Sequence, residues 1–158
     1  MDAKSQLGRR ALGHAEDALR AVETATKRKF LKFDDNQPAD LDGVVMEAGG
    51  IISCLYEVKA RNMTSTDFFE KYKGEWLLTY DKLVKAMALT KALRLSMVGV
   101  LYCIDDRVAL VKTLWDAQGN LKIKMRVEQT VTQKTVNGGA ASRANAYIDM
   151  NDAKRFDV

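Results

Sequence analysis

The chain is poor in the residues that many catalytic and metal sites require. Its 158 residues include one proline, one histidine and two cysteines. No zinc-ligand spacing surrounds Cys54 or Cys103, and the single His14 has no identifiable partner for nucleophilic catalysis, so we expect it to be solvated. The N-terminal MDAKSQLGRR lacks the apolar stretch of a secretory signal, and no run is long enough to span a bilayer. These features predict a cytoplasmic protein with two reduced thiols in its core.

The composition indicates one folded domain over residues 1–158. Hydrophobic residues make up 47% of the chain and charged residues 29%, and no low-complexity tract interrupts it. The formal net charge is +4 and the isoelectric point about 9.0. A basic balance of this size permits a polyanionic partner but does not demand one.

The first half of the chain predicts a helix followed by a β-hairpin. Residues 4–27 have apolar side chains at helical spacing, and 28–33 read as a short strand before a loop over 34–40. Two β-branched runs, 41–47 and 51–60, flank Gly49-Gly50, which is typical of a hairpin. The second run is apolar on both faces up to Tyr56, which favours a central strand.

The second half predicts a long helix and further strands. Residues 65–95 show a broad apolar stripe, with Thr64 and Asp67 resembling a capping box. Lys71, Lys82 and Lys85 lie on the opposite side, either as a solvated face or as a nucleic-acid contact. The expected strands are 96–104, 108–115, 121–128 and an edge strand over 146–150, with a mobile loop over 132–146. The pattern predicts an α/β fold in which helices flank a mixed sheet, in the order helix, strands, long helix, strands.

The hairpin brings charged residues together. A turn at Gly49-Gly50 pairs Ala48 with Ile51 and, further along the same register, Asp42 with Glu57. Opposed carboxylates repel each other unless a cation lies between them, and oxygen ligands are those that Mg²⁺ prefers. Lys59 lies two residues beyond Glu57 and therefore on the same face of the strand.

Two interpretations of this cluster remain open from the residues alone. Glu57 and Lys59 end an apolar strand, where charged residues are costly unless they are paired or used. This context favours a metal site with a cation beside it. In the alternative, Glu57 and Lys59 mark the point where the strand reaches water, and Asp42 caps its own turn.

At these residues the sequence resembles the PD-(D/E)xK, or restriction-endonuclease-like, nuclease superfamily. The matching segments are PADLDG over 38–43 and YEVKAR over 56–61, and the resemblance covers about residues 10–95. The literal Pro-Asp dipeptide is absent. Asp42 matches the motif best because of its register with Glu57, with Asp40 as the second choice.

The resemblance implies a metal-dependent nuclease. Asp42 and Glu57 would hold Mg²⁺ or Mn²⁺, together with the Val58 carbonyl and a glutamate of the first helix. That glutamate would be Glu16, with Glu23 as the alternative. Lys59 would orient the attacking water or stabilise charge on the phosphate, and the products would carry a 5′-phosphate.

Four basic residues are candidates for phosphate contact. Arg61 follows the motif strand directly. Lys73 lies on the predicted long helix and either reaches the site or snorkels to water. Lys134 and Arg143 belong to the predicted polar loop, which either clamps a nucleic-acid backbone or has no role.

The expected substrate is DNA, because small members of the resembled superfamily include Holliday-junction resolvases and other structure-selective nucleases. Such proteins are often homodimers, so we expect a homodimer that binds no membrane. A small restriction or phage nuclease is an alternative, and so is a non-catalytic module that binds nucleic acid or supports an assembly with the same fold. In a third interpretation, the aromatic stripe of the long helix makes the chain an interaction domain, although a core face explains that stripe more simply.

Overall fold

Two sheets and three helices make up the described part of the protein. A computed structural model describes residues 6–34, 41–133 and 140–158. The elements are α1 (Gln6–Thr26), β1 (Lys29–Lys32), β2 (Gly43–Met46), β3 (Ile52–Arg61), α2 (Ser65–Lys71), β4 (Glu75–Thr79), α3 (Tyr80–Leu93), β5 (Ser96–Cys103), β6 (Val108–Trp115), β7 (Met125–Gln133), β8 (Ala140–Asp149) and β9 (Lys154–Asp157). The α/β class and the mixed sheet predicted from the sequence are confirmed.

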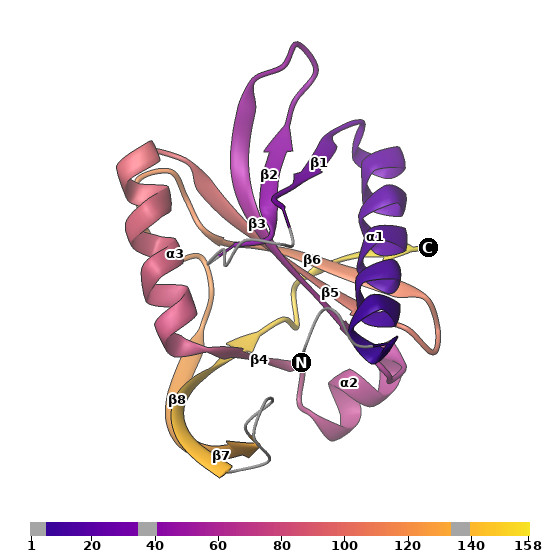
Figure 1. Ribbon diagram of the computed structural model, residues 1–158, viewed down its shortest axis with the longest axis vertical. Helices are drawn as coiled ribbons and strands as arrows, with labels where there is room; N and C mark the ends of the chain where they lie inside the picture. Colours follow the sequence, from indigo (N-terminus) through magenta and orange to yellow (C-terminus); the bar gives the residue numbers. More distant parts are fainter. Residues whose placement is uncertain (1–5, 35–40, 134–139) are drawn as a thin grey trace.

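The larger sheet has six strands in the order β1-β2-β3-β5-β6-β9. Strands β3 and β5 are parallel, and the other neighbours are antiparallel. Strand β3 lies between β2 and β5 and is buried from Cys54 to Val58, so the prediction of a central strand is confirmed. The crossover from β3 to β5 consists of α2, β4 and α3, with α1 and α3 on opposite sides of the strands in Figure 1.

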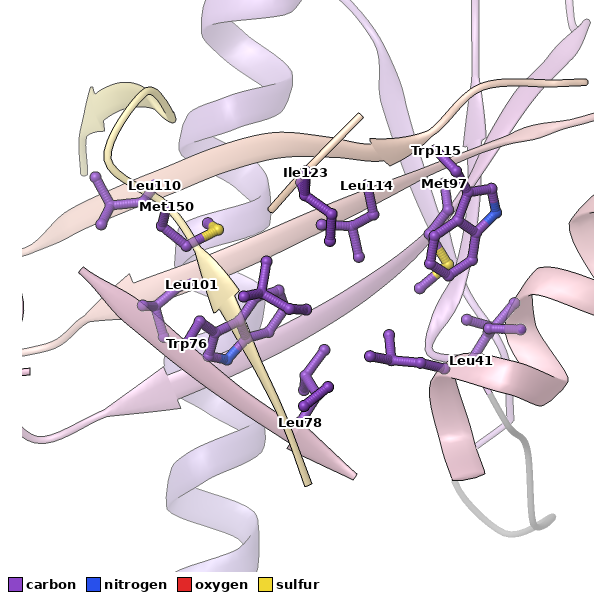
Figure 2. Packing of buried hydrophobic residues seen from close by; sticks show 14 of the residues in the cluster. Leu41, Trp76, Leu78, Met97, Leu101, Leu110, Leu114, Trp115, Ile123 and Met150 are labelled. Atoms are coloured by element: carbon purple, nitrogen blue, oxygen red, sulfur yellow. The ribbon is translucent and has the colours of Figure 1, made fainter. Parts of the chain in front are cut away.

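Alternate residues of β3 contribute to two separate cores. Cys54, Tyr56 and Val58 pack with Leu19 and Val22 of α1. On the other face, a core forms between the large sheet, α3 and the small sheet β4-β8-β7. Figure 2 shows side chains of this second core from both sheets, including Trp76, Leu78, Leu101 and Leu114. Odd-numbered residues of β3 therefore face α3 and the small sheet, and even-numbered residues face α1.

The prediction of one long helix over 65–95 is wrong, because this segment forms α2, β4 and α3. Lys73 and Gly74 both have positive φ angles, 56° and 68°, and the helix ends before them. Glycine is favoured just beyond a helix C-terminus, because left-handed backbone costs it little. The chain then forms β4, in which Trp76 and Leu78 are buried and Leu77 is exposed, before α3 begins at Tyr80. This alternation has the period of a strand.

The C-terminal third also differs from the sequence predictions. The strand expected over 121–128 is β7, which starts only at Met125. Residues 140–146 of the predicted mobile loop belong to β8, and residues 134–139 lie outside the described part of the chain. Strand β8 is the centre of the small sheet and not an edge strand, and β9 was not predicted.

Candidate active site

The β2–β3 hairpin places Asp42 beside Glu57. Gly43 pairs with Tyr56 and Val45 with Cys54, which is the register that the sequence predicted. The backbone N–H of Asp42 continues it by donating to the Tyr56 carbonyl at 3.1 Å. The predicted pairing of Ala48 with Ile51 is wrong, because a bulge between Val45 and Met46 shifts the pairing next to the turn, where the Glu47 N–H donates to the Ile51 carbonyl. Because the bulge absorbs that shift, the register at the motif end of the hairpin is preserved.

The Asp42 carboxylate is held by the backbone of β3. Asp42 immediately precedes β2, and its Oδ2 accepts a hydrogen bond of 2.7 Å from the N–H of Val58. The N–H and C=O of one strand residue leave on the same side, so the Val58 carbonyl also projects toward this edge. Gly43 fixes the approach of the strands, because a Cβ there would lie 2.1 Å from the Leu31 carbonyl oxygen.

Glu57 is a buried acid in contact with two bases. Its side chain is 1% exposed, on the face of β3 toward α3. Lys59 Nζ lies 2.6 Å from its Oε1, and Lys82 Nζ of α3 lies 2.7 Å from both carboxylate oxygens. Among the described residues, the buried Oε2 has no hydrogen-bond partner of proper geometry, although it forms an ion pair with Lys82. Buried charges need such partners, because desolvation of an isolated charge costs several kcal/mol or more.

Lys82 joins the two carboxylates. Its Nζ is 4.0 Å from Asp42 Oδ1 as well as 2.7 Å from Glu57. Burial raises the pKa of Glu57 above its ordinary value, and Lys59 and Lys82 counteract part of this rise. Burial alone would lower the pKa of Lys59, but the charges of Glu57 and Asp42 outweigh it and raise that pKa. The four groups form one electrostatic unit of two acids and two bases.

Lys82 is a residue that the sequence interpretation missed. It was assigned to the polar side of a continuous helix, whereas α3 has its own phase because β4 precedes it. In α3 the buried Ala86 and Thr90 follow Lys82 at intervals of four residues, so all three lie on the face toward the sheet. If the predicted helix is ended at Lys73-Gly74, α3 can be considered by itself, and Lys82 then shares the buried face with Ala86 and Thr90.

The glutamates predicted from the first helix lie apart from this unit. Helix α1 packs on the opposite face of β3 from Glu57. Glu16 is within 4.0 Å of Arg20 and 3.9 Å of Lys32, and Glu23 accepts a hydrogen bond from the N–H of Phe30 at 2.6 Å. The structure gives Glu16 and Glu23 contacts with α1 and β1 and none with Asp42 or Glu57.

The predicted phosphate contacts are divided between two places. Arg61 ends β3 on the same face as Glu57 and Lys59, and it lines a cavity together with Lys73. Lys73 lies in the turn after α2 and not on a long helix. Arg143 of β8 lines a different cavity at the start of α3, with Tyr80 and Val84. Lys134, like the second-choice metal ligand Asp40, lies outside the described residues.

The donor set at this site consists of oxygens. The described residues hold no cluster of three or more histidine, cysteine or acidic side chains able to bind a metal. Mg²⁺ is commonly held through one or two carboxylates and completes its shell with water and substrate phosphate. Asp42, Glu57 and the adjacent Val58 carbonyl therefore fit Mg²⁺ or Mn²⁺ in chemical type, and the ammonium of Lys82 supplies positive charge near both carboxylates.

Both cysteines are free and buried, as the sequence predicted. No helix within the described residues is long and apolar enough to cross a membrane. Comparisons of the chain with protein-family models, with curated proteins and with solved structures found no match.

Proposed function

We propose that this protein is a metal-dependent nuclease that hydrolyses phosphodiester bonds in DNA. The observation that carries the proposal is the placement of Asp42 against the Val58 N–H, with Glu57 and Lys59 on the next strand and in contact with each other. A carboxylate 1% exposed in the middle of a sheet is expensive to bury. Such a group is typical of sites where a charge has a chemical use.

Asp42, Glu57 and the Val58 carbonyl would hold Mg²⁺ or Mn²⁺. When bound, the metal would polarise the phosphate and lower the pKa of a coordinated water. Glu16 is not part of the proposed ligand set, because its contacts are with Arg20 and Lys32.

Lys59 would provide the positive charge for the reacting phosphate. Its Nζ is anchored to Glu57 at 2.6 Å, while its side chain is 33% exposed and so reaches the surface of the site. An ammonium held in a partly desolvated place stabilises developing negative charge without much reorganisation. It can orient a water or donate hydrogen bonds to phosphate oxygens.

Lys82 would keep the site neutral before the metal binds. It pairs with Glu57 and lies near Asp42, so the carboxylates are not left uncompensated. Its ammonium competes with a divalent cation for the same oxygens. Metal binding would therefore require the Lys82 ammonium to move away from Glu57, so this lysine would oppose metal binding.

The proposed substrate is a DNA of defined shape, such as a four-way junction. Selectivity would come from the shape of the DNA and from contacts with its backbone. A homodimer would suit a two-fold symmetric junction. Two free, buried thiols agree with a proposed cytoplasmic location.

The second candidate function is a non-catalytic module that binds nucleic acid or supports an assembly. The pairing of Glu57 with two lysines favours it, because those ion pairs satisfy the buried carboxylate without any metal. A small restriction or phage nuclease is a variant of the first proposal and would use the same residues.

The test is cleavage of labelled single-stranded, duplex and four-way-junction DNA with Mg²⁺ or Mn²⁺, beside EDTA. We expect metal-dependent cleavage that is lost in Lys59→Ala. Lys85→Ala is the matched control, because Lys85 lies on α3 and pairs with Asp81. If well-folded protein cuts no substrate with either metal, the non-catalytic module becomes the better explanation. Equal cleavage by Lys59→Ala and wild type would exclude the role given to Lys59.

A further inference from the structure

A cavity of about 410 Å³ opens beside the proposed active site. Arg61, which lines it, lies two residues beyond Lys59 on the same face of β3. Two residues of strand span about 7 Å. The cavity is therefore next to the place where the reacting phosphate would lie, in the direction in which β3 ends.

Aromatic side chains form part of the wall of this cavity. Phe68, Tyr72, Trp76 and Tyr147 line it, with Leu101 of β5 among its apolar atoms. Figure 2 shows Trp76 and Leu101 near each other in the core between the two sheets. The side chain of Tyr72 is 54% exposed at the C-terminus of α2, so its ring is available to an occupant. Aromatic walls of this kind accept flat, apolar groups.

Trp76 lines the same wall and has an unsatisfied donor. The residue is 2% exposed, and its indole Nε1 has no hydrogen-bond partner among the described residues. A buried donor without an acceptor costs free energy. Because this nitrogen is buried, an occupant of the cavity does not reach it, and the case for an occupant rests on the exposed Tyr72 ring and on the charged side chains of the rim.

The cavity also has a basic rim. Arg61, Lys71, Lys73 and Arg126 line it, opposed by Glu75. Arg126 makes two hydrogen bonds to Glu75, at 2.8 and 2.7 Å, and stacks on the Tyr147 ring with its guanidinium carbon 3.9 Å from the ring centre. Aromatic faces next to basic side chains are the combination that binds unpaired nucleotides, through base stacking and phosphate contacts.

We propose that this cavity binds one unpaired nucleotide next to the reacting phosphate, with its base against Tyr72 and its phosphate at Arg61. This proposal rests on the proposed nuclease function and narrows its substrate from DNA of defined shape in general to DNA with an unpaired base beside the cleaved bond, such as a bulge, in place of a fully paired four-way junction. Fully paired duplex would not fill the cavity, because its bases are stacked inside the helix.

The proposal can be tested by binding in EDTA, so that no cleavage takes place. The ligands are a fluorescein-labelled duplex with a one-nucleotide bulge, the same duplex with an abasic bulge, and the same duplex without a bulge. We expect the base-bearing bulge to bind wild type about tenfold more tightly than the abasic one, as one stacked base contributes. Tyr72→Ala should remove this difference, and Tyr72→Phe should keep it.

Phe33→Ala is the matched control, because Phe33 is an exposed aromatic residue outside the cavity. It should retain the tenfold preference. A 2-aminopurine at the bulge reports stacking directly, since its fluorescence should fall on binding to wild type and not to Tyr72→Ala.

The outcomes separate this inference from the proposed function. Cleavage of DNA by a protein that binds all three ligands equally would overturn the cavity proposal and leave the nuclease standing. A base preference that depends on Tyr72 would support the cavity even if no substrate were cut. If wild type and Tyr72→Ala show the same preference for the base-bearing over the abasic bulge, the proposal is overturned.

Discussion

Glu57 is the residue on which the account of the site depends. It is buried on the face of β3 toward α3, and its charge is balanced by Lys59 from the same strand and Lys82 from α3. Removing one partner of a buried ion pair is costly, because the remaining charge loses its compensation. Each charged residue of the unit therefore affects both the stability and the proposed metal affinity.

Replacing Lys82 should make the thermal stability of the protein depend more strongly on Mg²⁺. Lys82→Met leaves Glu57 with one base, and we expect it to lower the free energy of unfolding by about 2 kcal/mol in EDTA. Without the competing ammonium, saturating Mg²⁺ should raise the Tm of Lys82→Met more than that of wild type, because a ligand of the native state stabilises it. Thermal unfolding by circular dichroism measures both effects.

Lys85→Met is the control for this comparison, since Lys85 pairs with Asp81 on the exposed side of α3. It should behave as wild type does. An equal Tm rise in Lys82→Met and wild type would contradict the competition between Lys82 and the metal.

Cys103 gives a pH-dependent prediction away from the site. Burial, helped by the negative charge of Asp106, raises the pKa of its thiol from 9.0 to about 12. The unfolded chain releases this proton near pH 9 and the folded chain retains it, so stability is intact below pH 9 and falls as the pH rises above it. The loss attributable to Cys103 should approach about 1.4 kcal/mol per pH unit.

Urea unfolding of wild type and Cys103→Ala between pH 8 and pH 10.5 measures this difference. The free energy of unfolding should fall less steeply in the variant. At pH 8, iodoacetamide should label neither thiol of the native protein and both after unfolding. Rapid labelling of native Cys103 would show that the thiol is not buried as described.

At the scale of the elements, the hairpin β2–β3 holds the site, and close packing at Gly43 fixes it. A Cβ there would approach the Leu31 carbonyl at 2.1 Å and the Tyr56 ring at 2.7 Å. Neither neighbour can yield easily, because one is backbone and the other is a fully buried ring. The hairpin would have to shift, and the hydrogen bond between Asp42 and Val58 would shift with it.

Gly43→Ala should therefore lower both stability and activity. We expect a loss of about 2 kcal/mol in the free energy of unfolding and a reduced affinity for Mn²⁺. Gly13→Ala in α1 is the matched control, because nothing lies within 4 Å of a Cβ at Gly13. That substitution should stabilise the protein by about 0.5–1 kcal/mol through helix propensity. A Gly43→Ala protein as stable as wild type would refute the packing argument.

The hairpin β2–β3 and the strands β5 and β6 could be predicted from the sequence, because their signals are local. The turn glycines and the alternation of β-branched residues locate the hairpin, whereas the bulge that restores the register of Gly43 with Tyr56 has no local signal in the sequence. The structure of segment 65–95 could not be predicted in the same way. Its broad apolar stripe is compatible with one long helix, and equally with the observed succession of α2, β4 and α3. The pairing of β4 with β8, which decides between them, joins residues about seventy positions apart.

At the scale of the whole molecule, the site depends on which side of the sheet each helix covers. Asp42, Glu57 and Lys59 could be grouped from the sequence, because one hairpin holds them. Lys82 and Glu16 could not be placed correctly, because their positions follow from α3 and α1 packing on opposite faces of β3. That arrangement results from the parallel crossover and is not encoded in any local pattern.

The distribution of charge across the molecule predicts salt-dependent binding. Arg61 lies on the face with the proposed site, whereas Arg20 of α1 lies on the other. In EDTA, the logarithm of the binding constant for single-stranded DNA should fall linearly with the logarithm of salt concentration. Arg61→Ala should reduce the slope by about 0.7, the value for one phosphate contact, and Arg20→Ala should leave it unchanged. Equal slopes for all three proteins would remove Arg61 from the interface.

Mn²⁺ titration followed by electron paramagnetic resonance would show whether Asp42 and Glu57 hold a divalent cation. Free Mn²⁺ gives a strong signal that is lost on binding. We predict one Mn²⁺ site per chain in wild type, abolished in Asp42→Ala and Glu57→Gln. It should be retained in Asp81→Ala, whose carboxylate is 74% exposed on α3. Mn²⁺ binding that is absent in wild type, or unchanged in Asp42→Ala and Glu57→Gln, would show that these two carboxylates do not hold a divalent cation.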